Sequence, residues 1–211
     1  MQMINFFAEN YLLIGEKLLE HLAISLVSLA MGILVAVPLG ILLSKYKKIS
    51  NGVMGVASVL QTIPSFALLA LMIPIFGVGK KTAVAALFIY SLLPILRNTF
   101  LGLTSVTPSA IDAAKGMGME ERQILMKVKI PLALPVIMAG IRLSAVYVLA
   151  WTTLAAYVGA GGLGDFIFNG LNNYVPPMIL WGTLPITALA LLTDHLFGRL
   201  EQRLSPYKGG E

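Results

Sequence analysis

The sequence contains no cysteine among its 211 residues, which excludes a disulfide framework and a thiolate metal site. Only 12% of the residues are charged, about half of the roughly 25% that is typical of a soluble domain. The two histidines, His21 and His195, lie far apart and lack the spacing of metal ligands. No nucleophile–base set and no paired carboxylates stand out. We therefore expect no enzyme activity, no bound metal and no cofactor in this chain.

Hydrophobic residues are abundant instead: they make up 57% of the chain, with a mean hydropathy of +0.85. Apolar segments long enough to cross a hydrocarbon core of about 30 Å indicate an all-α, polytopic membrane protein with about five transmembrane helices. The expected spans are residues 22–44, 53–76, 82–96, 132–158 and 178–197. The third is short, and we expect it to extend at either end. We predict one transmembrane domain over 1–211, because no soluble region is long enough for a catalytic domain.

The basic residues are distributed unequally between the two sides that five crossings define. One side receives Lys45, Lys47, Lys48, Arg97, Lys115, Arg122, Lys127, Lys129, Arg199, Arg203 and Lys208. The other side receives only Lys17, Lys80 and Lys81. The positive-inside rule then predicts an outer N-terminus and a cytoplasmic tail over 199–211. Because topology accounts for the net charge of +5, nucleic acid is not an expected partner.

The first 20 residues are acidic, whereas a secretory signal begins with basic residues. Glu9, Glu16 and Glu20 stand against Lys17 alone. We therefore expect an uncleaved, amphipathic segment over 1–20 at the outer surface.

A polar loop, predicted over 98–130, separates the third and fourth spans. Thr107 and Pro108 are typical of a helix N-cap and first helical position. Gly116 and Gly118 are expected to end this short helix. A second helix with an apolar face would begin near residues 120–121 and end before Pro131, which starts a new segment. Such a helix–glycine–helix knuckle can dock into a groove on a soluble partner.

The loop resembles the cytoplasmic loop of permease subunits in bacterial ABC importers, whose motif is Glu-Ala-Ala, three residues, Gly, nine residues and Ile-x-Leu-Pro. The same spacing is present here, with Asp for Glu, Val for Ile and Ile for Leu. The matching residues are Asp112, Ala113, Ala114, Gly118, Val128, Ile130 and Pro131. The resemblance implies that they couple the chain to an ATPase, with Ala113, Ala114 and Gly118 packing on it. An ordinary connecting loop is the less favoured interpretation.

Residues 61–65, 93–99 and 159–165 resemble the osmoprotectant branch of these importers, which takes up glycine betaine, carnitine and choline. The resemblance extends over about 22–197 and implies a five-helix fold like that of methionine importers, in the bacterial cytoplasmic membrane. It also implies two ATPase subunits that hydrolyse ATP, a second permease (identical or paralogous) and an extracytoplasmic binding protein. Since the chain stops at Glu211, we expect that binding protein to be separate. The alternatives are another small solute, such as an amino acid or oxyanion, and an ATP-independent channel or secondary transporter.

Polar residues within the apolar segments are candidates for the pathway. Gln61, Thr62, Pro64 and Ser65 interrupt the second span, where they would line a path or join helices around a kink. Arg142 lies well inside the fourth span and would act as a gate, or snorkel to the surface. Near the end of the last span, residues 194–195 are interpreted as interfacial anchors rather than as a proton relay.

The segment 159–164 matches the GxGxxG dinucleotide pattern, yet no strand or βαβ unit surrounds it. We interpret it as a flexible outer gate loop containing Gly161 and Gly162, with a plain exposed turn as the alternative. Tyr147 and Trp151 are four residues apart and so lie on one helix face. Aromatic faces bind quaternary ammonium groups, but helix packing is the favoured interpretation of this pair.

Overall fold

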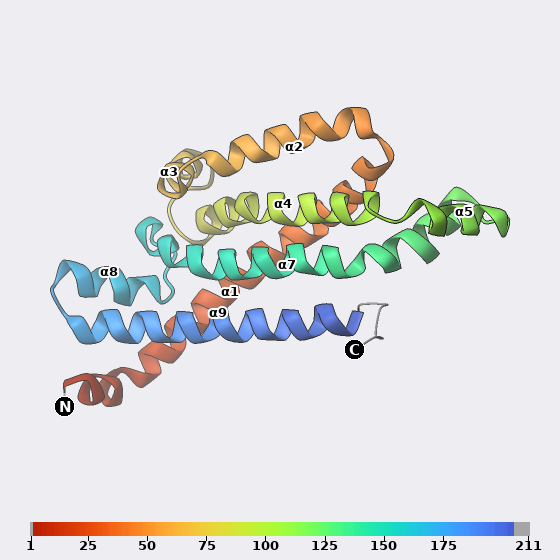
Figure 1. Ribbon diagram of the computed structural model, residues 1–211. Helices are drawn as coiled ribbons and strands as arrows, with labels where there is room; N and C mark the ends of the chain where they lie inside the picture. Colours follow the sequence, from red (N-terminus) through yellow and green to blue (C-terminus); the bar gives the residue numbers. More distant parts are fainter. Residues whose placement is uncertain (1, 205–211) are drawn as a thin grey trace.

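The computed structural model describes residues 2–204, and the secondary structure in this range is entirely helical. The long helices are α1 (Gln2–Lys45), α4 (Lys80–Thr104), α7 (Ile130–Thr152) and α9 (Pro176–Leu204). Figure 1 shows α4, α7 and α9 side by side, with α1 crossing them diagonally. Four helices are long and apolar enough to cross a membrane, or five if one bent pair counts as a span. The all-α, polytopic fold class is therefore confirmed.

The bent pair consists of α2 (Lys47–Thr62) and α3 (Ser65–Phe76), which meet at 99°. The sequence predicts a kinked span here, and the structure breaks the helix completely. Ile63 and Pro64 have extended ψ angles of 127° and 138°. The physical reason is that proline disfavours the helical conformation of the residue before it.

The first helix is longer than expected. The sequence predicts an outer segment over 1–20 that is separate from the span 22–44, yet α1 is one helix of 44 residues. At about 1.5 Å per residue it is roughly twice as long as a hydrocarbon core is thick, so part of it must project or tilt. Residue 1 and residues 205–211, including Lys208 of the predicted tail, lie outside the described residues.

The helix does not stop before Pro131, contrary to the prediction. A short helix α6 (Glu121–Ile124), a π-helical turn (Leu125–Lys129) and α7 follow one another without a break. The N–H of Ile130 bonds to the carbonyl of Leu125, five residues back. This wider turn lies directly before a proline that cannot donate an N–H of its own. The chain thereby continues as one helical rod from Glu121 to Val158.

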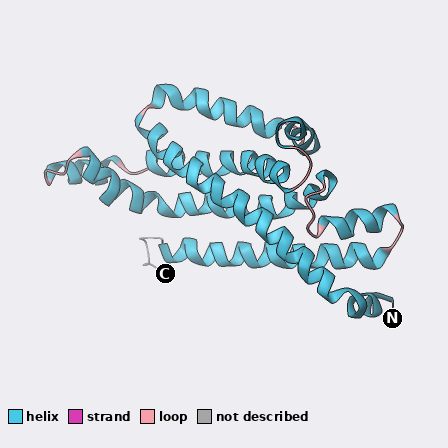
Figure 2. Cartoon of the chain, turned by 180° about the vertical axis from the view of Figure 1, so that it is seen from behind, coloured by secondary structure: helices cyan, strands magenta, loops and turns pink. Residues whose placement is uncertain are grey.

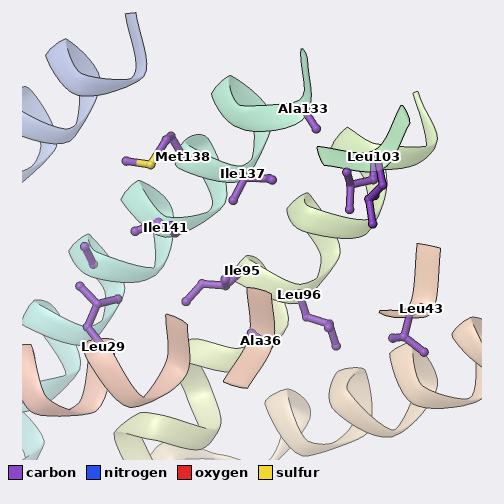
Figure 3. Close-up of a cluster of buried hydrophobic side chains, with 12 residues drawn as sticks. Leu29, Ala36, Leu43, Ile95, Leu96, Leu103, Ala133, Ile137, Met138 and Ile141 are labelled. Carbon is purple, nitrogen blue, oxygen red and sulfur yellow. The ribbon is translucent and has the colours of Figure 1, made fainter. Parts of the chain in front are cut away.

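The core lies where α1, α4 and α7 meet. Figure 3 shows side chains from all three helices converging there, among them Ala36, Ile95, Leu96, Ile137 and Ile141. Seen from behind in Figure 2, α1 crosses over the other long helices. Small residues let the backbones approach, as is usual between membrane helices.

Gly40→Ala tests the contact between α1 and α4. A Cβ at Gly40 would lie 2.7 Å from two carbons of Thr99, which is fully buried. Overpacking of this kind costs about 1–3 kcal/mol, so we expect a melting temperature several degrees lower in detergent. Gly15→Ala is the control, because nothing lies within 4 Å of its added carbon on the same helix. Equal melting temperatures for the two variants would contradict this packing.

Candidate functional site

The predicted knuckle projects from one end of the molecule, where α5 (Pro108–Gly116) precedes α6 (Figure 1). Thr107 and Pro108 occupy the N-cap and first helical positions, as predicted. The N–H of Gly118 donates to the carbonyl of Lys115 at 2.9 Å, and Gly118 has a φ of +76°. Glycine adopts this left-handed conformation at low cost, which explains the tight turn between the helices.

The second helix begins with a reciprocal cap. The N–H of Glu120 donates to the Oε1 atom of Gln123 at 3.0 Å, while the Glu120 carboxylate accepts a backbone N–H in return. This capping box satisfies donors that a helix start leaves free. It also holds the turn after Gly118 in one geometry, so the knuckle is a defined shape.

The knuckle residues differ in their exposure. Asp112, Ala113 and Gly118 are exposed, and nothing lies within 4 Å of a carbon added at Gly118. Ala114, by contrast, is only 1% exposed, so it packs within the chain. Pro131 is exposed on the rod that leaves the knuckle, whereas Val128 and Ile130 are half-buried there.

Two exposed methionines were missed by sequence reasoning. Met117 is 69% exposed and Met126 is 59% exposed. Unbranched and polarisable, methionine adapts to irregular contact surfaces. The sequence feature that could have indicated the exposure of Met117 is its position between two glycines that end a helix.

A network of charges lies at the opposite end of the molecule. The Lys17 ammonium donates to Asp165 at 2.7 Å and to Glu20 at 3.1 Å, while Lys80 donates to the second oxygen of Glu20 at 2.9 Å. The N–H of Gly162 also donates to Glu20 at 3.2 Å. This network joins α1, α4, the glycine segment and α8 (Gly164–Asn172).

The glycine segment is packed against α1, which argues against a plain exposed turn. Gly161 and Gly162 both have φ angles of +84°, and Gly162 is buried. A Cβ at Gly161 would collide with the Glu20 carboxylate, and one at Gly162 would meet His21 at 3.3 Å. The glycines are therefore needed for close approach as well as for backbone conformation.

Arg142 forms an ion pair that sequence reasoning did not predict. Its guanidinium donates two hydrogen bonds to Asp194 of α9, at 2.6 and 2.7 Å, and a third to Glu201 at 3.4 Å. Its side chain is about one-third exposed, at 36%. Asp194 is thus the partner of Arg142, and the cost of a charge inside a span is met by pairing. No sequence spacing could connect the two, since they are 52 residues apart.

The polar groups at the break between α2 and α3 are satisfied partly from α4 and partly within α2. The Tyr90 hydroxyl donates to the Ile63 carbonyl at 2.5 Å, and the Thr62 hydroxyl donates to Val59 at 2.7 Å. Ser65 lines a small cavity with Trp151 and Tyr90. Gln61 is half-buried at the same break, whereas Pro64 is exposed.

The aromatic pair that the sequence places on one face is partly packed. Trp151 lies 4.5 Å from the buried ring of Tyr90 and 5.5 Å from Tyr147, between ring centroids. Tyr147 itself is 42% exposed. Packing therefore accounts for Trp151, and it leaves one face of Tyr147 open.

Comparison with known proteins gives a consistent result. Residues 28–206 match the family described as binding-protein-dependent transport system inner membrane component. The chain is 56% identical to the carnitine transport permease protein OpuCB of Listeria monocytogenes, covering 96% of this chain and 93% of that protein. It is 48% identical to the choline transport system permease protein OpuBB of Bacillus subtilis, covering 90% and 88%. A third relative, the glycine betaine/carnitine/choline permease OpuCB of Bacillus subtilis, is 47% identical, covering 97% and 94%.

Solved structures show the same fold at low sequence identity. The MetNI methionine ABC transporter in an inward-facing conformation gives a TM-score of 0.84 at 23% identity, covering 92% of this chain and 97% of that chain. An amino acid ABC transporter gives 0.77 at 20% identity, covering 93% and 96%. The five-helix, methionine-importer-like fold implied by the sequence is thereby confirmed.

The pair between Arg142 and Asp194 is tested by a double-mutant cycle. We expect Arg142→Met and Asp194→Leu each to lower the yield of folded protein in the membrane, because Arg142→Met leaves Asp194 without its partner and Asp194→Leu leaves Arg142 with only the longer contact to Glu201. The double variant should recover much of the loss, since no charge of the pair remains. Yield is measured by fluorescence-detected size exclusion. Losses that simply add in the double variant would refute the pairing.

Proposed function

The chain belongs to the family of binding-protein-dependent transport system inner membrane components, and on this premise we propose that it forms part of the path for quaternary ammonium osmoprotectants. It is a multi-pass permease subunit of an ABC importer and not an enzyme. Permeases of this type work with ATPase and substrate-binding partners in a membrane. The proposed cargo is glycine betaine, carnitine or choline.

One observation carries the substrate class. Three relatives that are 47–56% identical over at least 88% of their own length are named for carnitine, choline or glycine betaine transport. The solved amino acid and methionine transporters share the fold at 20–23% identity, which supports the architecture and says nothing about the cargo.

We assign the ATPase contact to the exposed part of the knuckle, at Asp112, Ala113 and Gly118. The arrangement supports this role, because the knuckle joins directly onto the helical rod from Glu121 to Val158. A displacement of the knuckle is carried along that rod through Val128, Ile130 and Pro131 to the glycine segment. Such rigid-body movement is a general means of alternating access.

The orientation of the chain in the membrane decides which end faces the binding protein. Basic residues concentrate at the knuckle end, so this end is cytoplasmic and the N-terminus lies outside a bacterial cytoplasmic membrane. A separate binding protein delivers the cargo to the end that carries the Glu20 network. A second permease, identical or paralogous, completes the path.

Within the span region, Gln61, Thr62, Pro64 and Ser65 are assigned to the path because the helix break presents polar groups there. Gly161 and Gly162 form the outer gate with Glu20. Arg142 is assigned a structural role. Its charge is compensated by Asp194 and Glu201, so it does not repel a cationic cargo.

The direct test is uptake of labelled glycine betaine at high osmolarity. The host lacks its own osmoprotectant importers and expresses the chain with the genes that neighbour it. We expect ATP-dependent uptake that excess carnitine or choline inhibits. Uptake of an amino acid or oxyanion instead would keep the importer and reject the cargo. Transport without any bound ATPase would reject the importer itself.

Gly118→Asp tests the coupling surface in the same assay. We expect uptake to fall at least tenfold while the protein remains in the membrane, because an exposed acidic side chain would stand in the ATPase contact. Gly118→Ala is the control: alanine tolerates the left-handed conformation no better than aspartate does but adds only a methyl group. If Gly118→Ala lowers uptake as much as Gly118→Asp, backbone strain explains the loss and the contact does not.

A further inference from the structure

One face of α7 carries two neighbouring aromatic rings, Tyr147 and Trp151. The ring centroids of Tyr147 and Trp151 are 5.5 Å apart, and their planes differ by only 31°. The cavity between Trp151, Tyr90 and Ser65 has a volume of about 10 Å³, room for a single water. The inner face of Trp151 is therefore occupied by packing, and only the outer faces of this pair remain available to a ligand.

A second aromatic group continues toward the outer end of the same rod. Tyr157 lies 4.9 Å from Phe66 and 4.2 Å from Phe168, between ring centroids. Tyr157 is 60% exposed and Phe66 is 49% exposed. Phe66 follows Ser65, which lines the cavity beside Trp151, so the two groups adjoin at the break between α2 and α3.

Tyr147 lies too deep for an interfacial belt. It is roughly 20 Å from the outer end of the rod at Val158 and about 25 Å from Ile130, by helix rise. Interfacial tyrosines gather at the headgroup level instead. Within residues 2–204, no group of the chain forms a hydrogen bond with the Tyr147 hydroxyl. Tyr147 is 42% exposed, and a hydroxyl without a partner at this depth is unfavourable against hydrocarbon, which indicates that the face borders water or a polar ligand.

Three basic side chains near this part of the chain are already paired with carboxylates. Arg142 is nine residues before Trp151, about half a turn around α7, and it is held on the α9 side by Asp194 and Glu201. At the outer end, Lys17 and Lys80 are paired with Glu20. Near the rings, Arg142, Lys17 and Lys80 are thus each held by a carboxylate.

We propose that Tyr147 and Trp151 form a transit subsite for a trimethylammonium group, with Tyr157 and Phe66 as the preceding contact on the outer side. The inference rests on the proposed function for the identity of the cargo. Aromatic faces attract such cations within about 6 Å of the ring centroid. Contacts of this kind are weak at exposed sites, which suits a position that cargo must leave as well as enter.

Tyr147→Leu and Tyr147→Phe test the subsite in the complete importer, reconstituted in vesicles with its ATPase, second permease and binding protein. Loss of the ring should slow glycine betaine uptake about fivefold, while ATP hydrolysis stimulated by the loaded binding protein stays within twofold. Tyr147→Phe keeps the ring and should keep the uptake rate. The matched control is Tyr11→Leu, which removes a ring that is 55% exposed on α1.

A binding measurement separates the subsite from the transport assay. The chain has two tryptophans, so Trp181→Phe leaves Trp151 as its only indole fluorophore. In the full chain in lipid nanodiscs, choline should change the Trp151 emission, whereas its neutral isostere 3,3-dimethylbutan-1-ol should not. Adding Tyr147→Leu should weaken the response to choline severalfold.

The outcomes are distinguishable. If the wild-type importer takes up no quaternary amine, the proposed function fails, whatever Tyr147 does. If it takes up glycine betaine and Tyr147→Leu transports as fast as Tyr147→Phe, the subsite alone is refuted. An equal emission change with the neutral isostere would assign the rings to lipid or subunit packing and would also overturn the subsite.

Discussion

The bilayer offers no water to satisfy a polar group, and the structure depends on this constraint. Backbone groups are satisfied within helices, and the interruptions are satisfied by neighbours. The Tyr90 hydroxyl covers the carbonyl that the break at Ile63 leaves open. Arg142 is paired with Asp194 across two helices. These two contacts tie the break between α2 and α3 to α4, and α7 to α9.

The same constraint explains how movement can pass through the chain. Helices that pack through glycines, such as Gly40 against Thr99, are rigid bodies with little room to deform. On the coupling proposed above, a knuckle attached to an unbroken rod would act on the far end of that rod. There the Glu20 network holds α1, α4 and the glycine segment together by ion pairs and one backbone hydrogen bond. Contacts of this kind can be exchanged when the rod moves, whereas a close-packed glycine contact cannot.

The basic residues are arranged differently at the two ends of the molecule. At the knuckle end the basic residues are numerous, which supports the cytoplasmic orientation proposed for it. At the opposite end the few lysines are paired with carboxylates. Within the span, the positive charge of Arg142 is turned toward α9. The charge of Arg142 is consequently held half a turn away from Trp151, a separation that suits a cationic cargo.

The sequence by itself determined the membrane class, the all-α fold and the knuckle, because hydropathy, helix caps and glycine stops act over short stretches. Thr107, Pro108 and the capping residues near Glu120 could be interpreted without any knowledge of their neighbours. The pairing of Arg142 with Asp194, the burial of Ala114 and the contact of Gly162 with Glu20 could not. The two contacts join residues that are distant in sequence, and the burial of Ala114 depends on which face of its helix turns inward. Only tertiary packing determines these features. The helix that continues through Pro131 could not be predicted either. Proline usually breaks a helix, but here the π-helical turn just before it accommodates the ring.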